Sequence, residues 1–241
     1  MPNTKHTRTA VIDIGTLKSK FEVREFDQDF NDHVLHRDKE LTVLGRDLDK
    51  TDNQIIDSAV QKTIDALNKF KAKMEELKVD KYKVVSTEAI RKAINAQKVL
   101  TQIKQLTGMT VEILSHQDEA EIYFRSVSKD FPNQIIAVSD IGGGSVQVVI
   151  GKNQDIYEAH LFKTGTYFMQ ETFSKTHHPT TQELQNAIDH VKVQLLPLAK
   201  SKYKPDLVVY GSTNIIDFLQ AMHLNLLHLK TTGSHQFKIH K

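Results

Sequence analysis

Cysteine and tryptophan are both absent from this sequence of 241 residues, and each absence excludes a kind of site. Without cysteine the chain can form no disulfide, thiolate nucleophile or cysteine metal site. Without tryptophan, and with aromatic residues at only 7%, stacking platforms for single-stranded nucleic acid are not expected. The net charge of +2 gives no broad basic field either, so the sequence predicts no nucleic-acid partner.

Long apolar runs are also missing. No stretch of about 18 apolar residues occurs, which argues against a membrane span, and the polar start from Met1 to Ala10 lacks the apolar region of a secretory signal. We therefore expect a cytoplasmic protein with no membrane partner. The 39% of hydrophobic residues is ordinary for a globular chain, whose length fits one large domain or two small ones.

One short segment of the sequence occurs twice. Ala10–Gly15 reads Ala-Val-Ile-Asp-Ile-Gly and Ala137–Gly142 reads Ala-Val-Ser-Asp-Ile-Gly, with five of six positions identical at an offset of 127 residues. Both copies continue into β-type residues, Phe21–Val23 in one and Val146–Ile150 in the other. Each copy therefore predicts a β-hairpin around a glycine-bearing turn, and the pair predicts a duplicated unit.

The apolar spacing between and after these copies alternates between the helical and the extended period. Such alternation predicts an α/β architecture with mixed sheets flanked by helices. We expect two domains, residues 1–128 and 129–241, with the boundary near residues 126–134. The expected helices are Gln54–Leu77, Glu88–Leu106, Asp118–Val127, Gln182–Ala199 with Thr180 as N-cap and Glu183 in capping-box spacing, and Thr213–Met222; the expected strands are Tyr82–Ser86, Val111–Leu114 and Asp206–Tyr210.

The second copy continues into a run of three glycines. Asp140 ends a buried strand, and Gly142, Gly143, Gly144 and Ser145 follow it. Glycine lets the backbone approach a ligand closely, and successive N–H groups in such a turn form a nest for an anion. A flexible turn is the alternative reading, but two-residue hairpin loops need no triple glycine. The pattern therefore predicts phosphate binding, with a divalent cation held by the aspartate.

The first copy predicts a partner for this loop. Asp13, Gly15 and Thr16 occupy the corresponding positions, and duplicated hairpins that face each other would enclose one polyanion from both sides. An Asp-x-Gly turn is common and carries little weight alone. Its likeness to the second copy is what makes it a candidate phosphate site.

Twin Asp-x-Gly hairpins resemble the actin-like, sugar-kinase and Hsp70 ATPase fold, in which two duplicated ribonuclease H-like domains enclose a cleft. Within that fold, Ser86–Asn95 is similar to the Thr-Ser-Ala-x-Arg-x-Ala-x-Asn segment of the exopolyphosphatase/guanosine-pentaphosphate phosphohydrolase (Ppx/GppA) family. Thr107–Ala120 resembles its Ile-Ser-Gly-x-Glu-Glu-Ala segment, and Leu44–Gly45 and Lys163–Thr166 also fit. The resemblance extends from about residue 10 to residue 220.

The resemblance implies a hydrolase that removes terminal phosphates from inorganic polyphosphate with Mg²⁺. Phosphoryl transfer asks little covalent chemistry of the protein, so a cation, backbone donors and one base suffice. Glu119 would be the general base that activates water, and Asp140 would hold Mg²⁺. The implied phosphate-binding residues are Arg91, Gly142, Gly143, Gly144 and Ser145 on one side and Asp13, Gly15 and Thr16 on the other.

Three alternatives remain open at this point. A phosphohydrolase of guanosine pentaphosphate would use the same residues. A non-catalytic sensor of polyphosphate or a nucleotide is favoured by Leu17 and Gln147, where the family usually has asparagine and glutamate, and by a chain end at Lys241 that suggests a shortened second domain. A kinase or ATPase ranks last, because Gly211–Asn214 lacks the glycine pair of a nucleotide loop. The resemblance also suggests a homodimer.

Overall fold

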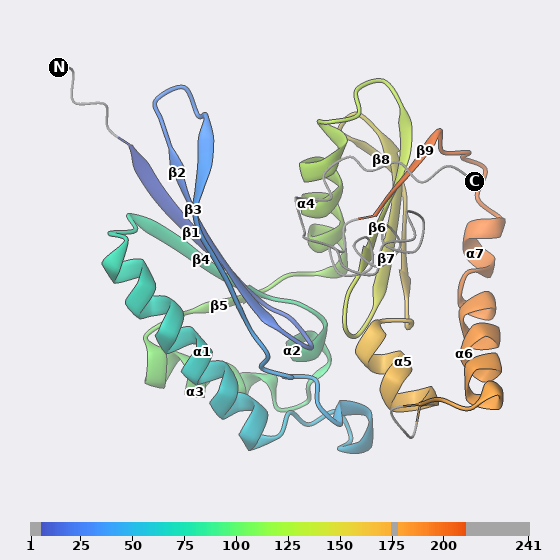
Figure 1. The fold of residues 1–241 in the computed structure, drawn as a ribbon, viewed down its shortest axis with the longest axis horizontal. Coiled ribbons are helices and arrows are strands. Elements are labelled where there is room, and N and C mark those ends of the chain that lie inside the picture. Colours follow the sequence, from blue (N-terminus) through green and yellow to red (C-terminus); the bar gives the residue numbers. More distant parts are fainter. Residues whose placement is uncertain (1–5, 175–177, 211–241) are drawn as a thin grey trace.

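Two mixed β-sheets stand side by side in the structure, a computed structural model that describes residues 6–174 and 178–210 (Figure 1). Helices pack against both sheets, as the alternating sequence pattern predicts, so the α/β architecture is confirmed. The helix expected at Thr213–Met222 and the segment Gly211–Asn214 lie outside the described residues.

The first sheet has five strands in the order β3-β2-β1-β4-β5. β1 pairs antiparallel with β2, which pairs antiparallel with β3, whereas β1, β4 and β5 are parallel neighbours. The ends of β1 and β4 therefore reach the same edge of the sheet. The strands are β1 (Thr7–Ile14), β2 (Ser19–Phe26), β3 (Asp32–Glu40), β4 (Lys81–Ser86) and β5 (Val111–Ile113).

Within the described residues, helices cover one face of this sheet and leave the other exposed. Ile12 and Phe21 are buried beneath α1, and the Phe21 ring stacks on that of Phe70 with centroids 4.9 Å apart. Val11, which points to the opposite face, is 51% exposed. A mixed sheet with one solvated face shows this alternation of apolar and exposed positions. The helical segments of this part are η1 (Leu48–Lys50), α1 (Asp57–Glu76), α2 (Glu88–Lys92) and α3 (Ala96–Thr107).

The second sheet has four strands in the order β8-β7-β6-β9 and is covered on both faces. Phe124 of α4 packs against Ile136 on one face, and Leu198 of α7 packs against the other. The strands are β6 (Ile135–Ile141), β7 (Val146–Lys152), β8 (Asp155–Phe162) and β9 (Leu207–Tyr210), and the helices are α4 (His116–Ser128), α5 (Thr166–Phe173), α6 (Thr181–Gln194) and α7 (Leu196–Ala199).

The duplicated segments form the same structure twice. β6 pairs antiparallel with β7 and parallel with β9, as β1 does with β2 and β4. The turns close with equivalent hydrogen bonds, from Gly15 N to Lys18 O at 3.1 Å and from Gly142 N to Ser145 O at 2.9 Å. The predicted pair of glycine-bearing hairpins is thus confirmed. The exact domain bounds stay a prediction.

The prediction of a single helix over Glu88–Leu106 is wrong, because the helix is interrupted between α2 and α3. Ala93 has extended dihedrals, and the Asn95 side chain bonds both the N–H and the carbonyl of Ile55, at 3.0 and 2.9 Å. A side chain that satisfies a distant backbone segment competes with helix continuation, so apolar spacing alone did not reveal the break.

The helix expected over Gln182–Ala199 is also divided. α6 ends at Gln194, and Pro197 lies in the first turn of α7, where its missing N–H costs nothing. The predicted N-cap is confirmed: Thr180 Oγ1 accepts from Glu183 N at 3.2 Å, and the Glu183 carboxylate accepts from Thr180 N at 2.8 Å. The sequence did not predict β3, β8 or α5.

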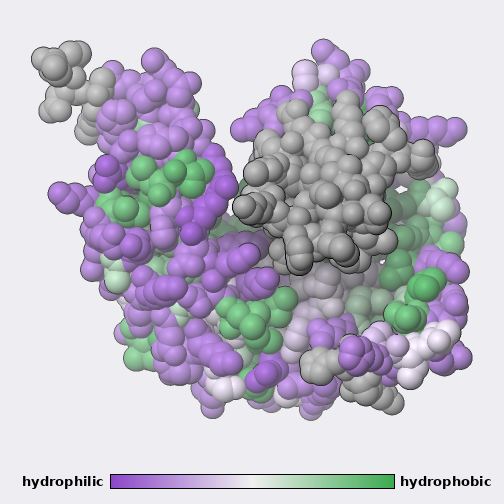
Figure 2. Space-filling view, viewed as in Figure 1, coloured by the Kyte–Doolittle hydropathy of each residue, from purple (hydrophilic) through white to green (hydrophobic). Residues whose placement is uncertain are grey.

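Figure 2 shows that the visible surface of the described residues is mainly hydrophilic, with apolar side chains in separate patches. In the portion of the chain that the structure describes, no helix combines the length and the apolar character needed to cross a bilayer.

Candidate functional site

The two hairpin turns face each other across a cleft of about 390 Å³. β1, β4 and β6 all end at this cleft, so the residues that follow these strands converge from both sheets. Every site residue predicted from the sequence lines the cleft except Arg91. The lining residues are Asp13, Gly15, Thr16, Leu17, Lys18, Lys20, Lys39, Thr87, Glu88, Glu119, Asp140, Ile141, Gly142, Gly143, Gly144, Ser145, Gln147 and Thr166.

At the base of the cleft the hairpins are in direct contact. A Cβ atom on Gly144 would lie 3.0 Å from Thr16 Oγ1 and 3.1 Å from Glu88 Cγ. A Cβ atom on Gly165 would lie 2.3 Å from the backbone of Gly144 and Ser145, closer than real side chains approach. Glycine is required at position 165 by this close approach of the backbone, whereas at position 144 a side chain would crowd the side chains of Thr16 and Glu88.

The glycine loop leaves its N–H groups available. The carbonyls of Gly142 and Gly143 accept hydrogen bonds of 2.9 Å from the start of α5, at Thr166 N and Tyr167 N. Among the described residues, the N–H groups of Gly143, Gly144 and Ser145 donate no hydrogen bond to the protein. Because unpaired N–H groups in one turn form an anion nest, this loop can bind phosphate oxygens with its backbone.

Glu119 lies in the first turn of α4, the helix that packs against β6 and β7. Ser115 caps this helix by accepting from Asp118 N at 3.0 Å. Burial raises the pKa of the Glu119 carboxyl above its usual range, and the lowering effects of Arg91 and Gln147 do not cancel it. A carboxylate with a raised pKa is better matched to accept a proton near neutral pH.

Arg91 does not line the cleft but lies behind the two glutamates that do. Its Nη2 atom is 3.2 Å from Glu88 Oε2 and 3.1 Å from Glu119 Oε2, and its Nη1 atom donates to the carbonyl of Leu114. The side chain is 16% exposed. The arginine thus orients the Glu119 carboxylate in this structure rather than presenting its own donors to the cleft.

Asp140, at the end of β6, is partly buried. Burial raises the pKa of its carboxyl, Lys20 lowers it, and the charge of Asp13 raises it again. Lys20 Nζ lies 3.6 Å from Asp13 Oδ2, at the mouth of the same cleft. Two carboxylates thus face the cleft with one lysine between them.

These two carboxylates fit Mg²⁺ only in combination with a phosphate group. In the described ranges, no three or more His, Asp or Glu side chains are arranged to hold a metal ion. Mg²⁺ is commonly bound by one or two carboxylates together with substrate phosphates and water. Asp140, with Asp13 beside it, matches that pattern in residue type and number.

Glu88, Lys39 and Thr166 line the cleft but were not predicted as site residues. Glu88 is only 8% exposed and also forms an ion pair of 3.3 Å with Lys92. Glu88 follows β4, which is parallel to β1. Because the carboxyl ends of parallel strands meet at one edge of a sheet, this position could have indicated that Glu88 lies near Asp13. Lys39 lies on β3, where it is the cross-strand neighbour of Lys20 on β2. The sequence pattern did not predict β3.

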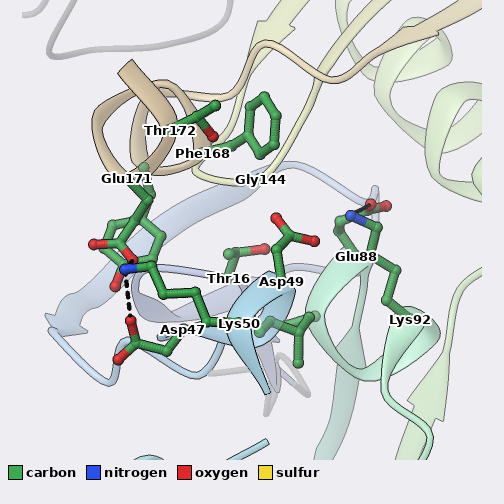
Figure 3. A pocket seen from close by; sticks show the side chains of 14 residues that line it. Thr16, Asp47, Asp49, Lys50, Glu88, Lys92, Gly144, Phe168, Glu171 and Thr172 are labelled. Atoms are coloured by element: carbon green, nitrogen blue, oxygen red, sulfur yellow. Dashed lines mark hydrogen bonds and ion pairs between the residues drawn. The ribbon is translucent and has the colours of Figure 1, made fainter. Parts of the chain in front are cut away.

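A second, smaller pocket of about 220 Å³ lies on the far side of the contact among Thr16, Glu88 and Gly144 (Figure 3). Lys50 crosses it to form ion pairs with Asp47 at 3.0 Å and Glu171 at 2.9 Å. Carboxylates outnumber ammonium groups in its lining, which consists of Thr16, Gly45, Asp47, Leu48, Asp49, Lys50, Glu88, Ala89, Lys92, Gly144, Tyr167, Phe168, Glu171 and Thr172. Both of its lysines are already paired with carboxylates, so this pocket offers a polyanion fewer free cations than the larger cleft, where Lys18 and Lys39 have no ion-pair partner among the described residues.

Two mixed sheets of shared topology, with glycine-bearing hairpins facing across a cleft, define a protein of the actin-like fold. A structure of an Aquifex aeolicus Ppx/GppA family member matches 93% of the chain and 72% of its own, with 28% identity and a TM-score of 0.74. An exopolyphosphatase from Cytophaga hutchinsonii matches 92% of the chain and 73% of its own, with 25% identity and a TM-score of 0.81.

The model of the Ppx/GppA phosphatase family matches residues 23–230, and the chain belongs to that family. A guanosine-5'-triphosphate,3'-diphosphate pyrophosphatase from Photobacterium profundum is 27% identical over 149 residues, which are 61% of this chain and 30% of that protein. The chain spans only about a third of the length of the curated relatives it matches. The resemblance stated from the sequence is thus confirmed at the level of fold and family.

Proposed function

We propose that the chain hydrolyses the terminal phosphoanhydride bond of inorganic polyphosphate in the cleft between its two hairpins. The observation that carries this proposal is the placement of three unpaired N–H groups, on Gly143, Gly144 and Ser145, in the same cleft as the partly buried carboxylate of Glu119. Backbone donors stabilise phosphoryl oxygens, and a carboxylate orients water, which are the two tasks that hydrolysis requires.

The charge distribution supports the cleft, rather than the smaller pocket, as the site of the polyanion. Lys18, Lys20 and Lys39 line the cleft around the first hairpin. The smaller pocket contains Asp49 and other carboxylates, and its lysines are already paired. A chain of phosphates would therefore extend along the lysines and end at the glycine loop.

Each residue of the cleft has a distinct task in this reaction. The glycine loop binds the oxygens of the terminal phosphoryl group, and Glu119 accepts a proton from the attacking water. Arg91 holds the Glu119 carboxylate in place at 3.1 Å. Mg²⁺, bound by Asp140 and Asp13 together with phosphate oxygens, would neutralise negative charge on the phosphoryl group.

Guanosine pentaphosphate is the second candidate substrate. It is favoured by the relative from Photobacterium profundum, which is named a pyrophosphatase of guanosine-5'-triphosphate,3'-diphosphate, a guanosine pentaphosphate, while the relative from Cytophaga hutchinsonii is named an exopolyphosphatase. Both substrates offer a terminal phosphoanhydride to the same glycine loop. They differ only in what extends from the cleft.

Phosphate release in the presence of Mg²⁺ tests the proposal, with Glu119→Gln as the main variant. This change keeps the size of the side chain but removes the base, and we expect release to fall at least about a hundredfold. Glu121→Gln is the matched control on the same helix, because Glu121 pairs with exposed Arg125 outside the cleft, and it should retain activity.

Polyphosphate and guanosine pentaphosphate are supplied separately, so that their relative rates identify the substrate. Binding of both is measured in parallel. A folded, Mg²⁺-supplied protein that binds either compound and releases no phosphate would contradict hydrolysis and indicate a sensor. Equal activity of the Glu119 variant and its control would exclude Glu119 as the base.

A further inference from the structure

Three residues line both the cleft and the smaller pocket, and they separate the two spaces: Thr16, Glu88 and Gly144 (Figure 3). They come from three segments, the turn after β1, the start of α2 and the glycine loop. Their contact is tight, because a Cβ atom on Gly144 would lie 3.0 Å from Thr16 Oγ1 and 3.1 Å from Glu88 Cγ. We call these three residues the partition. The cleft therefore ends at the partition on this side.

Glu88 contributes the largest side chain of the partition, and basic side chains hold its carboxylate in place. The Oε2 atom of Glu88 lies 3.2 Å from Arg91 Nη2 and 3.8 Å from His116 Nε2. Its Oε1 atom lies 3.3 Å from Lys92 Nζ. Charge-assisted contacts of this kind are stronger than hydrogen bonds between neutral groups, so Glu88 is a fixed obstacle at the end of the cleft.

Two lysines of the cleft lie on the other side of β1 from Glu88. Lys39 on β3 is the cross-strand partner of Lys20 on β2, and Lys20 is that of Asp13 on β1. Glu88 follows β4, which pairs with the opposite edge of β1. Because neighbouring strands lie about 4.8 Å apart, this row of side chains leads away from Glu88 strand by strand. A polyanion therefore meets cations at one end of the cleft and the partition at the other.

We propose that the partition, through the bulk of the Glu88 side chain, closes the cleft behind the terminal phosphoryl group, so that a polyphosphate chain is cleaved only at its end. This inference rests on the proposed hydrolysis and assigns the residue that determines which bond is cut. A chain bound at the glycine loop can extend toward the lysines but not past Glu88. Beyond the partition, Lys50 and Lys92 are both paired with carboxylates, so a phosphate gains little by entering the smaller pocket.

The variant Glu88→Ala tests this assignment, because shortening the side chain should permit internal cleavage. Water would then add across an internal P–O–P bond and yield two shorter polyphosphates, without release of orthophosphate. The test substrate is a polyphosphate of defined length whose two terminal phosphates are esterified, so that it offers no free end. We expect Glu88→Ala to cut these capped chains at least about tenfold faster than the wild type, which is the size of effect that a steric change in a substrate pocket produces.

A ratio measured within one reaction separates this role from a general loss of activity. Glu88 also contacts Arg91, which holds Glu119, so the total rate of the variant should fall. On chains with free ends, electrophoresis therefore compares fragments of intermediate length with orthophosphate, and this ratio does not depend on the total rate. The wild type should shorten chains one unit at a time, whereas Glu88→Ala should produce intermediate fragments from the first turnovers.

Two further variants separate bulk from charge. Glu88→Gln keeps the size of the side chain and removes its charge, so cleavage should stay terminal. Asp49→Asn is the matched control, because Asp49 lines the smaller pocket but not the cleft. This change removes a carboxylate beyond the partition without opening it. Both variants should leave capped chains uncut, and cleavage by Glu88→Gln as fast as by Glu88→Ala would overturn a closure that depends on bulk.

The outcomes distinguish this inference from the proposed function. If the wild type releases no phosphate from chains with free ends, the hydrolase proposal fails. If the wild type is active and Glu88→Ala still cuts only at chain ends, Glu88 does not close the cleft, although hydrolysis stands. Cleavage of capped chains by the wild type would also overturn the inference. Thermal unfolding of each variant is measured first, and Glu88→Ser decides the matter should Glu88→Ala not fold.

Discussion

The two hairpins share one turn geometry, which brings Asp13 opposite Lys20 in the β1–β2 hairpin and Asp140 opposite Gln147 in the β6–β7 hairpin. The backbone registers are equivalent, but the charge balance is not. Asp13 has an ammonium group 3.6 Å away and a side chain that is 35% exposed. Asp140 has the neutral Gln147 as its cross-strand partner, and burial raises the pKa of its carboxyl.

This difference shows how one repeated structure can acquire two tasks. A carboxylate that is buried without a paired cation is costly, and it gains most from a metal ion or from substrate-bound charge. The first hairpin instead supplies lysines to its side of the cleft. The second hairpin thus combines a carboxylate that can bind a cation with the unpaired N–H groups of its glycine loop, whereas the first hairpin adds lysines to the same cleft.

The glycines that support the two turns offer the largest expected effect. In Gly165→Ala the new methyl would collide with the backbone of Gly144 and Ser145 at 2.3 Å, whereas in Gly45→Ala it would meet only the Thr16 methyl at 2.4 Å. A side chain can rotate away, but the backbone cannot. We expect losses in unfolding free energy of about 3 kcal/mol for Gly165→Ala and about 1 kcal/mol for Gly45→Ala.

Urea unfolding of the two variants measures this difference. Equal losses would mean that the second turn adapts as easily as the first, and that the tight contact of Gly165 does not fix the phosphate loop. Phosphate release by Gly165→Ala should also fall, because a displaced loop no longer aligns its N–H groups.

Neutralising the two aspartates should change stability in opposite directions at neutral pH. The folded pKa of Asp140 is raised above the unfolded value of 3.8. Its contribution to stability is therefore present below the unfolded pKa and is lost as pH rises through the folded pKa. In the presence of a chelator, Asp140→Asn should stabilise the protein by about 1 kcal/mol near neutral pH, and less as the pH falls.

Asp13→Asn should instead destabilise the protein by less than about 1 kcal/mol, since it removes a partly exposed ion pair with Lys20. Thermal unfolding of both variants at two pH values checks the signs. A stability loss in Asp140→Asn at neutral pH would show that its carboxylate is already compensated, and the contrast between the hairpins would then be wrong.

The smallest expected change in stability is that of a substitution that makes the first hairpin resemble the second. Lys20→Gln places glutamine opposite Asp13, as Gln147 is opposite Asp140, and should change the unfolding free energy by less than about 1 kcal/mol. Because Lys20 lowers the pKa of Asp140, that pKa should rise in the variant. Carboxyl ¹³C NMR titration measures it, with Lys18→Gln as a control on the same turn. An unchanged Asp140 titration would contradict the coupling of the two hairpins.

Much of the site could be predicted because it is local. The composition of Gly142 to Ser145 predicted a candidate phosphate loop, and the repeat predicted that Asp13 lies in a matching hairpin; the structure brings both to one cleft. Glu88 could not be recognised in this way, since an acid at the start of a helix is ordinary until β4 is known to lie beside β1. Arg91 was recognised by its motif, but its contacts with Glu88 and Glu119 depend on packing.

The amino-acid sequence by itself determined the alternation of strands and helices and the two glycine-bearing turns, because periodicity and glycine chemistry act within a few residues. Only the tertiary structure decided the break at Asn95, which depends on Ile55, and the convergence of Glu119, Asp140 and Gln147 on one cleft. Burial, and with it the raised pKa values of Glu119 and Asp140, arises from segments distant in the chain. The residues near Glu119 and Asp140 in the sequence therefore do not predict that burial.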